Sequence, residues 1–121
     1  MISIVAPAYN EEAVIKGFVE QVVDVTRFFF ECGNWELIVV DDGSTDRTKD
    51  ILYRLKSAYP LSVITHVKNY GMGKALETGF EAAKGNIVVT MNADCSHDPV
   101  LIPTLCQEIV STGCHVAIAP C

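Results

Sequence analysis

The sequence predicts an α/β fold in three layers, with a mainly parallel sheet between two layers of helices. Short apolar runs alternate along the chain with segments in which apolar residues recur every three or four positions, as expected for strands and amphipathic helices. The connections are short, which is typical of parallel strand–helix–strand units. The strongest run, residues 37–40, is apolar without interruption, as in a strand that is covered on both faces.

The first half of the chain is expected to contain two strands and two helices. Apolar runs at residues 2–6 and 35–40 predict the strands. Between them, spacings of three and four predict a helix with Asn10 as its N-cap and one buried stripe. The members of that stripe are Val14, Phe18, Val22, Val25 and Phe29. A second stripe over residues 48–59 predicts the second helix.

The second half of the chain repeats this alternation. Residues 61–66, 86–91 and 116–119 predict strands, and residues 75–83 and 101–109 carry the apolar positions of two further helices. Right-handed crossovers are expected to order the strands 3-2-1-4, which is the doubly wound, Rossmann-like arrangement. The carboxyl ends of the first and fourth strands then flank the ligand-binding edge, and the loops after the strands converge there.

Length and composition narrow the class of protein. The 121 residues make one domain by length. The formal net charge is −6 and the pI about 4.9, which excludes a generic nucleic-acid-binding surface, because such a surface needs clustered Lys and Arg. No apolar run approaches the roughly 20 residues that cross a bilayer. Five cysteines without a CxxC spacing indicate reduced thiols and a cytoplasmic setting.

Acidic side chains gather at the predicted ligand edge, where only Lys68 and Lys74 oppose them. The acids there are Glu11, Asp41, Asp42, Asp46, Asp94 and Asp98. Two carboxylates about 5 Å apart repel by roughly 3 kcal/mol at an effective dielectric constant near 20. The edge therefore needs a divalent cation, hydrogen-bond donors from a ligand, or both. Carboxylate oxygens favour Mg²⁺ or Mn²⁺ as the cation.

Five of these acids also have a purely structural interpretation. Asp46 and Asp98 are better explained as helix caps than as ligands. For Glu11, the interpretations as a partner of the helix dipole and as a site residue are equally favoured. For the pair Asp41 and Asp42, a role as acceptor for the N–H edge of uracil or guanine is favoured over a plain turn. The reason is that a carboxylate fixed at a strand end can accept such donors.

Two other features of the edge carry weaker signals. Residues 71–74 read GMGK and open a helix, so that backbone N–H groups and the Lys74 ammonium can approach a diphosphate. They match neither a Walker A loop nor a dinucleotide fingerprint. Of the three histidines, only His97 is expected near the acidic edge, as a packed or capping residue.

Four stretches together resemble the inverting family 2 glycosyltransferases of the GT-A fold. In chain order they are IVAPAYNEE, LIVVDDGSTDRT, NYGMGKALETGF and MNADCSHDP. The fourth is similar to the DxD metal motif and its flank, above all as found in polyprenyl- or dolichyl-phosphate mannosyltransferases and related glucosyltransferases. The resemblance covers nearly all of residues 1–121. It implies the donor-binding part of a GT-A domain, truncated so that the acceptor-binding part is absent.

The resemblance implies an enzyme that transfers a sugar, with inversion, from a nucleoside diphosphate sugar to an acceptor. The donor is of the GDP-mannose or UDP-glucose type, and the acceptors include polyprenyl phosphates at the cytoplasmic face of a membrane. The resemblance also implies that Pro7, Tyr9 and Glu11 line the nucleoside pocket. Asp42, with Asp41 behind it, is implied to hold the base.

At the diphosphate, the resemblance implies that Lys74 approaches the phosphates. Asp94 is implied to ligate Mg²⁺ or Mn²⁺ and to be the catalytic residue. Asn92 replaces the first acid of DxD, and Ala93 follows it in the nucleotide site. The amide oxygen of Asn92 still suits ribose or metal, but with a lower expected metal affinity.

Two alternatives stay open on the residues alone. A signalling receiver domain also combines an acidic pair with Mg²⁺, although here the pair follows the second strand rather than the first. A non-catalytic or truncated nucleotide-binding module is favoured by Asn92 and by the early end of the chain. That end is also expected to expose apolar surface beside the fourth and fifth strands, which predicts self-association.

Overall fold

The elements of the protein alternate between strand and helix as the sequence predicts. The computed structural model describes residues 1–30, 33–93 and 116–118. The elements are β1 (Ile2–Ala8), α1 (Ile15–Phe29), β2 (Trp35–Asp41), α2 (Thr48–Leu55), β3 (Leu61–Thr65), α3 (Met72–Ala82), β4 (Ile87–Thr90) and β5 (Val116–Ile118). Neighbouring strands are parallel, in the order β3-β2-β1-β4-β5, which confirms the predicted order 3-2-1-4. The predicted helix over residues 101–109 lies outside the described residues.

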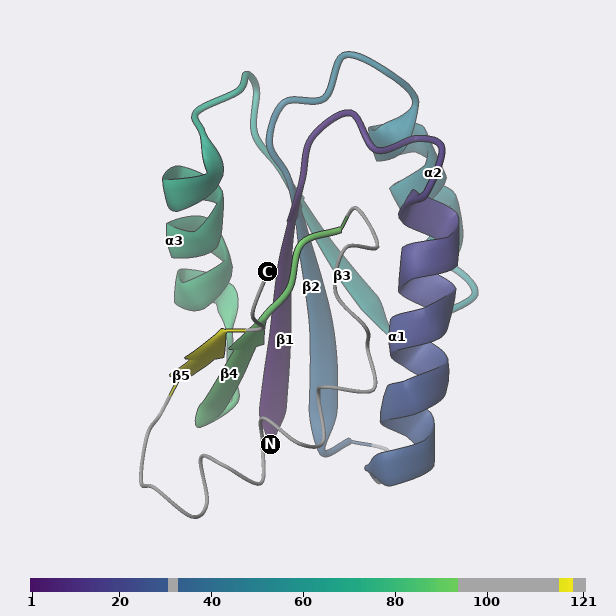
Figure 1. The fold of residues 1–121 in the computed structure, drawn as a ribbon, viewed down its shortest axis with the longest axis vertical. Coiled ribbons are helices and arrows are strands. Elements are labelled where there is room, and N and C mark those ends of the chain that lie inside the picture. The colour runs from purple at the N-terminus through teal and green to yellow at the C-terminus, as the bar shows by residue number, and fades with distance from the viewer. Residues whose placement is uncertain (31–32, 94–115, 119–121) are drawn as a thin grey trace.

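Helices cover both faces of the sheet. Figure 1 shows α1 and α2 on one face and α3 on the other, so the three-layer prediction is confirmed. Side chains alternate between the two faces along each strand. Ile4 and Leu37 belong to the core under α1 and α2, whereas Val5 and Ile38 belong to the core under α3. All of β1 is buried, as expected for a strand in the middle of a covered parallel sheet.

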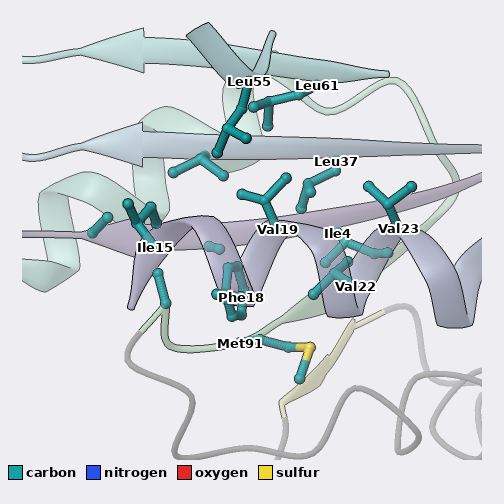
Figure 2. Packing of buried hydrophobic residues seen from close by; sticks show 14 of the residues in the cluster. Ile4, Ile15, Phe18, Val19, Val22, Val23, Leu37, Leu55, Leu61 and Met91 are labelled. Atoms are coloured by element: carbon teal, nitrogen blue, oxygen red, sulfur yellow. The ribbon is translucent and has the colours of Figure 1, made fainter. Parts of the chain in front are cut away.

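The buried face of α1 differs from the predicted stripe. The buried side chains of α1 are Ile15, Phe18, Val19, Val22, Val23 and Thr26, and Figure 2 shows Phe18, Val19 and Val22 against the sheet. Phe29 of the predicted stripe is 53% exposed, so that part of the prediction was wrong. The observed positions repeat at i, i+3 and i+4, which makes a band two residues wide. By its helical angle Phe29 falls within this band, but it is the last residue of α1 and its side chain stays exposed.

Helix α3 lies directly against β1 at Gly79. A Cβ at this position would overlap Val5 Cγ1, so the helix backbone rests on the side chain of the strand. The other buried residue of α3 is Ala75, one turn earlier. Small residues therefore set the distance between α3 and the sheet, and this distance positions the loop that precedes α3 at the carboxyl edge.

Gly79→Ala is expected to lower the free energy of unfolding by about 1–3 kcal/mol, because the added methyl group forces Val5 or α3 to move. The matched control is Gly17→Ala in α1, where a Cβ meets nothing within 4 Å. There the better helix propensity of Ala should raise stability by up to about 1 kcal/mol. Urea denaturation measures both variants, and equal changes in the two would contradict the close contact at Gly79.

Candidate functional site

A cavity of about 310 Å³ lies at the carboxyl edge of the sheet. Its walls come from the ends of β1, β2 and β4 and from the loop before α3, as a doubly wound sheet predicts. The lining residues are Pro7, Ala8, Tyr9, Glu11, Asp42, Asn69, Gly71, Met72, Asn92 and Ala93. The predicted site residues among them are Pro7, Tyr9, Glu11, Asp42, Asn92 and Ala93. The structure thus brings together residues from three separate stretches of the predicted site.

Asp42 is a buried charge in the wall of this cavity, with only 4% of its surface exposed. Its Oδ1 accepts hydrogen bonds from His66 Nδ1 at 2.8 Å and from the N–H of Tyr70 at 2.9 Å. Its Oδ2 accepts one from the N–H of Gly71 at 2.9 Å. Burial raises the pKa of Asp42, but these donors outweigh burial and hold the pKa below its ordinary value. The carboxylate is therefore ionised at neutral pH.

The sequence prediction missed His66, which forms a hydrogen bond with Asp42 of the cavity wall. Its Nδ1 is bonded to Asp42, and its Nε2 lies 2.9 Å from Thr78 Oγ1 in α3. Because an ionised carboxylate only accepts, Nδ1 carries the proton, and in the neutral ring Nε2 accepts from Thr78. The expectation that only His97 lies near the acidic edge was wrong; His97 itself lies outside the described residues. The available signal was that His66 directly follows β3 and so reaches the same edge.

The acidic turn touches the loop before α3 at Gly43. Its φ is +71°, and a Cβ there would lie 2.5 Å from the backbone nitrogen of Asn69. Only glycine combines this backbone conformation with so close an approach. The contact holds residues 68–71 beside the end of β2, where the N–H groups of Tyr70 and Gly71 reach Asp42.

Asn10 ties the loop after β1 to the acidic turn. Its Oδ1 accepts the N–H of Thr45 at 2.8 Å and that of Asp46 at 3.3 Å, and its own N–H donates to Ser44 Oγ at 3.0 Å. Asn10 has a φ of +52°, a conformation that Asn adopts more readily than most residues. The prediction that Asn10 caps α1 was wrong. The N-cap is Val14, without a side-chain cap, because the Asn10 side chain is engaged by the turn.

Asp46 and Thr48 complete this tie. Asp46 Oδ1 accepts from the N–H of Thr48 at 2.9 Å and from its hydroxyl at 2.6 Å, and Oδ2 accepts the N–H of Glu12 at 3.3 Å. Thr48 Oγ1 in turn accepts the N–H of Glu11 at 2.8 Å. Burial raises the pKa of Asp46, but the hydrogen bonds outweigh burial and leave the pKa lowered. Asp46 thus serves the start of α2, as a cap residue does, although the cap position itself is Arg47.

Three predicted site residues are not among those that line the described cavity. Asp41, the last residue of β2, is buried, and its Oδ1 accepts the N–H of Ser44 at 3.3 Å. The Nζ atom of Lys74 lies 3.7 Å from Glu77 Oε2 on the surface of α3. Asp94 lies outside the described residues, as does Asp98.

The described wall of the cavity carries negative charge. Its acidic residues are Glu11 and Asp42, so an anionic ligand there needs a cation beside it. A carboxylate at Glu11 and an amide oxygen at Asn92 are the hard oxygen donors that Mg²⁺ and Mn²⁺ prefer. Within the described residues, no group of three or more His, Cys, Asp or Glu is placed to hold a metal ion. The predicted ligand Asp94 follows Ala93 of the wall directly in the sequence, and its part in holding a divalent cation stays a prediction.

The sheet order and the cavity define a doubly wound α/β protein with its candidate site at the switch point between β1 and β4, where this class binds ligands. The chain belongs to glycosyl transferase family 2, whose model matches residues 3–121. This membership confirms the resemblance that the four stretches indicate and replaces the signalling receiver domain as an explanation of the acidic pair.

Relatives and solved structures agree with this assignment. The dolichol-phosphate mannosyltransferase of Pyrococcus furiosus is 35% identical over 117 residues, which cover 97% of this chain and 32% of that protein. S. aureus TarS 1-349 in complex with UDP has a TM-score of 0.77 at 25% identity, over 93% of this chain and 32% of that chain. The mannosyltransferase PcManGT from Pyrobaculum calidifontis, in complex with GDP-Man and Mn²⁺, has a TM-score of 0.66 at 28% identity. The match covers 77% of this chain and 27% of that chain. The chain therefore spans about a third of the length of the proteins it matches.

Acid is expected to destabilise the protein through Asp42. The pKa of Asp42 is below its ordinary value of 3.8 in the folded protein, so the unfolded chain binds the proton more tightly. The stabilisation is full above about pH 5 and is lost as the pH falls through the folded pKa. Asp42→Asn should lose less stability on acidification than the unmodified chain, with Asp46 still contributing. Urea denaturation between pH 2 and pH 6, roughly the range in which carboxylates titrate, tests this; an unchanged pH slope in Asp42→Asn would contradict it.

His66→Ala is expected to lower the free energy of unfolding by about 1–3 kcal/mol, because the buried carboxylate of Asp42 loses one donor. His66→Gln keeps a side-chain N–H that can reach a carboxylate, so it should recover part of the loss. Urea denaturation of both variants at neutral pH measures the difference. A His66→Ala variant as stable as the unmodified chain would show that the hydrogen bond contributes nothing.

Proposed function

We propose that this chain forms the donor-binding part of a glycosyltransferase that moves a sugar, with inversion, from a nucleoside diphosphate sugar to an acceptor. The observation that carries the proposal is the cavity at the switch point, with the ionised carboxylate of Asp42 in its wall. Membership of glycosyl transferase family 2 supports the reaction class. Because the relatives are about three times as long, the complete reaction belongs to the proposal as well.

The nucleoside is proposed to lie between Pro7 and Asp42. Tyr9 lines this part of the cavity and is 42% exposed, so its ring offers an apolar face to a base or a ribose. Asp42 offers an acceptor to the N–H edge of uracil or guanine, and Asp41 supports the turn behind it. The complexes of TarS with UDP and of PcManGT with GDP-Man support a nucleoside diphosphate as the ligand class.

The diphosphate is proposed to lie toward Asn92 and Ala93, together with a divalent cation. Asp94 and Asn92 would hold Mg²⁺ or Mn²⁺, and Lys74 would approach the phosphates. When bound, the cation neutralises the charge that develops on the leaving nucleoside diphosphate. The Mn²⁺ in the PcManGT complex supports a divalent cation. Asn92 contributes a neutral oxygen, so the metal affinity should be lower than with two acids.

A lipid phosphate is the proposed acceptor. The name of the relative from Pyrococcus furiosus includes dolichol phosphate. A phosphate acceptor is an anion at neutral pH, so it needs a binding pocket rather than a strong general base. Within the described residues, no helix is long and apolar enough to span a bilayer. A lipid acceptor would instead bring the enzyme to the cytoplasmic surface of a membrane.

A non-catalytic nucleotide-binding module is the second candidate. Asn92, in place of an acid, is the observation that favours it. Such a module would bind a nucleotide without transferring a sugar. Self-association through surface beside β4 and β5 also stays a prediction, which light scattering can check.

Calorimetric titration with UDP and GDP, each with and without Mn²⁺, tests the donor site. One of the two nucleotides should bind, and more tightly with Mn²⁺. Asp94→Ala should abolish the metal-dependent part of the affinity, whereas Asp42→Ala should weaken binding even without metal. The matched control Asp50→Ala removes an exposed acid of α2 and should bind like the unmodified chain.

The possible failures of this experiment are distinct. An unchanged affinity of Asp94→Ala in the Mn²⁺ titration would contradict the metal assignment. Equal nucleotide affinities of Asp42→Ala and the unmodified chain would contradict the base contact. Binding of neither nucleotide would contradict the donor site itself.

A further inference from the structure

We propose that Asp42 makes the base pocket selective for uracil over guanine, because donors from the described part of the chain already occupy all but one of its acceptor positions. The inference rests on the proposed function. An ionised carboxylate offers about four lone-pair positions. His66 and Tyr70 fill two on Oδ1, and Gly71 fills one on Oδ2. Among the residues that the structure describes, no further donor reaches Asp42, so one position on Oδ2 is left for a ligand.

Uracil and guanine differ in the number of donors that they present to a carboxylate. Uracil has a single N–H, at N3, between two carbonyl groups. Guanine presents two adjacent donors, at N1 and at the exocyclic amino group, and the pair fills two acceptor positions. One open position satisfies the single donor of uracil. Guanine would either leave a donor unpaired or displace a protein donor, and both cost free energy in a buried site.

The same three protein donors fix the orientation of the carboxylate. Tyr70 and Gly71 lie in the loop whose backbone touches the acidic turn at Gly43. His66 is anchored on its far side by Thr78 Oγ1, 2.9 Å from Nε2. Asp42 therefore cannot rotate to present both oxygens to a base without breaking these bonds. His66 is accordingly a positioning residue, which acts on the base through Asp42.

Titrations of the unmodified chain with UDP, N3-methyl-UDP and GDP at a fixed Mn²⁺ concentration test the selectivity. UDP should bind at least about tenfold more tightly than GDP, the factor that corresponds to one unpaired donor. Methylation of N3 removes the single donor of uracil and should weaken binding by at least about tenfold as well. Because only the ligand changes, misfolding of a variant cannot produce either result.

The results separate this inference from the proposed function. GDP binding as tightly as UDP, or more tightly, would overturn the selectivity and leave the donor site intact. N3-methyl-UDP binding as well as UDP would overturn the contact between N3 and Asp42. Binding of none of the three nucleotides would overturn the proposed function and this inference with it.

The role of His66 is tested by the ratio of the UDP and GDP affinities. His66→Ala frees one acceptor position on Asp42 and lets the carboxylate rotate. The preference for UDP over GDP should therefore become smaller. His66→Gln retains a donor and should restore the ratio toward that of the unmodified chain. If His66 had a merely structural role, His66→Ala would weaken the binding of both nucleotides by the same factor. An unchanged ratio of the two affinities in His66→Ala would therefore overturn the positioning role.

Discussion

Burial of the Asp42 carboxylate is the constraint on which the carboxyl edge of the sheet depends. A buried charge is tolerated only where hydrogen-bond donors replace water. The donors come from the end of β3 and from the loop before α3, so His66, Tyr70 and Gly71 must converge on one side chain. This convergence requires Gly43, because a side chain there would push the loop away. The cavity is bounded by elements that the charge itself holds in place.

The polar residues on either side of Asp42 divide between two tasks. Asp42 faces the cavity, whereas the residues after it bind the loop that follows β1. The residues of this tie are Asn10, Ser44, Thr45, Asp46 and Thr48. Most of their bonds join a side chain of one loop to the backbone of the other, so neither loop can move alone. Many polar residues of the acidic turn therefore serve to hold the two loops of the cavity wall together, and only some of them serve ligand binding.

The sequence allowed the sheet order and most of the cavity wall to be predicted, because apolar runs locate strands and the carboxyl ends of parallel strands meet at one edge. Local sequence patterns did not predict the contacts of side chains whose hydrogen-bond partners are distant in the sequence. Asn10 is a residue type that often caps helices, yet its side-chain oxygen accepts a hydrogen bond from a turn more than thirty residues later. His66 meets Asp42 and Thr78 only after β3 and α3 have packed. Phe29 was misplaced because helical spacing gives the direction of a side chain but not the point at which the packed part of a helix ends, and Phe29 is the last residue of α1.

Strand β2 holds α3 at both of its ends. Near the start of the strand, Glu36 Oε2 accepts the N–H of Lys84, just after α3, at 2.7 Å. At the other end, Asp42 accepts the N–H of Gly71, just before α3, at 2.9 Å. Between these points Gly79 rests on β1. The wall that carries the Asp42 acceptor is thus held by contacts within the chain itself, and such preorganisation lowers the ordering cost of binding. The same hydrogen bonds that dock α3 limit what Asp42 can offer a base, so a change that relaxes base selection also loosens this helix.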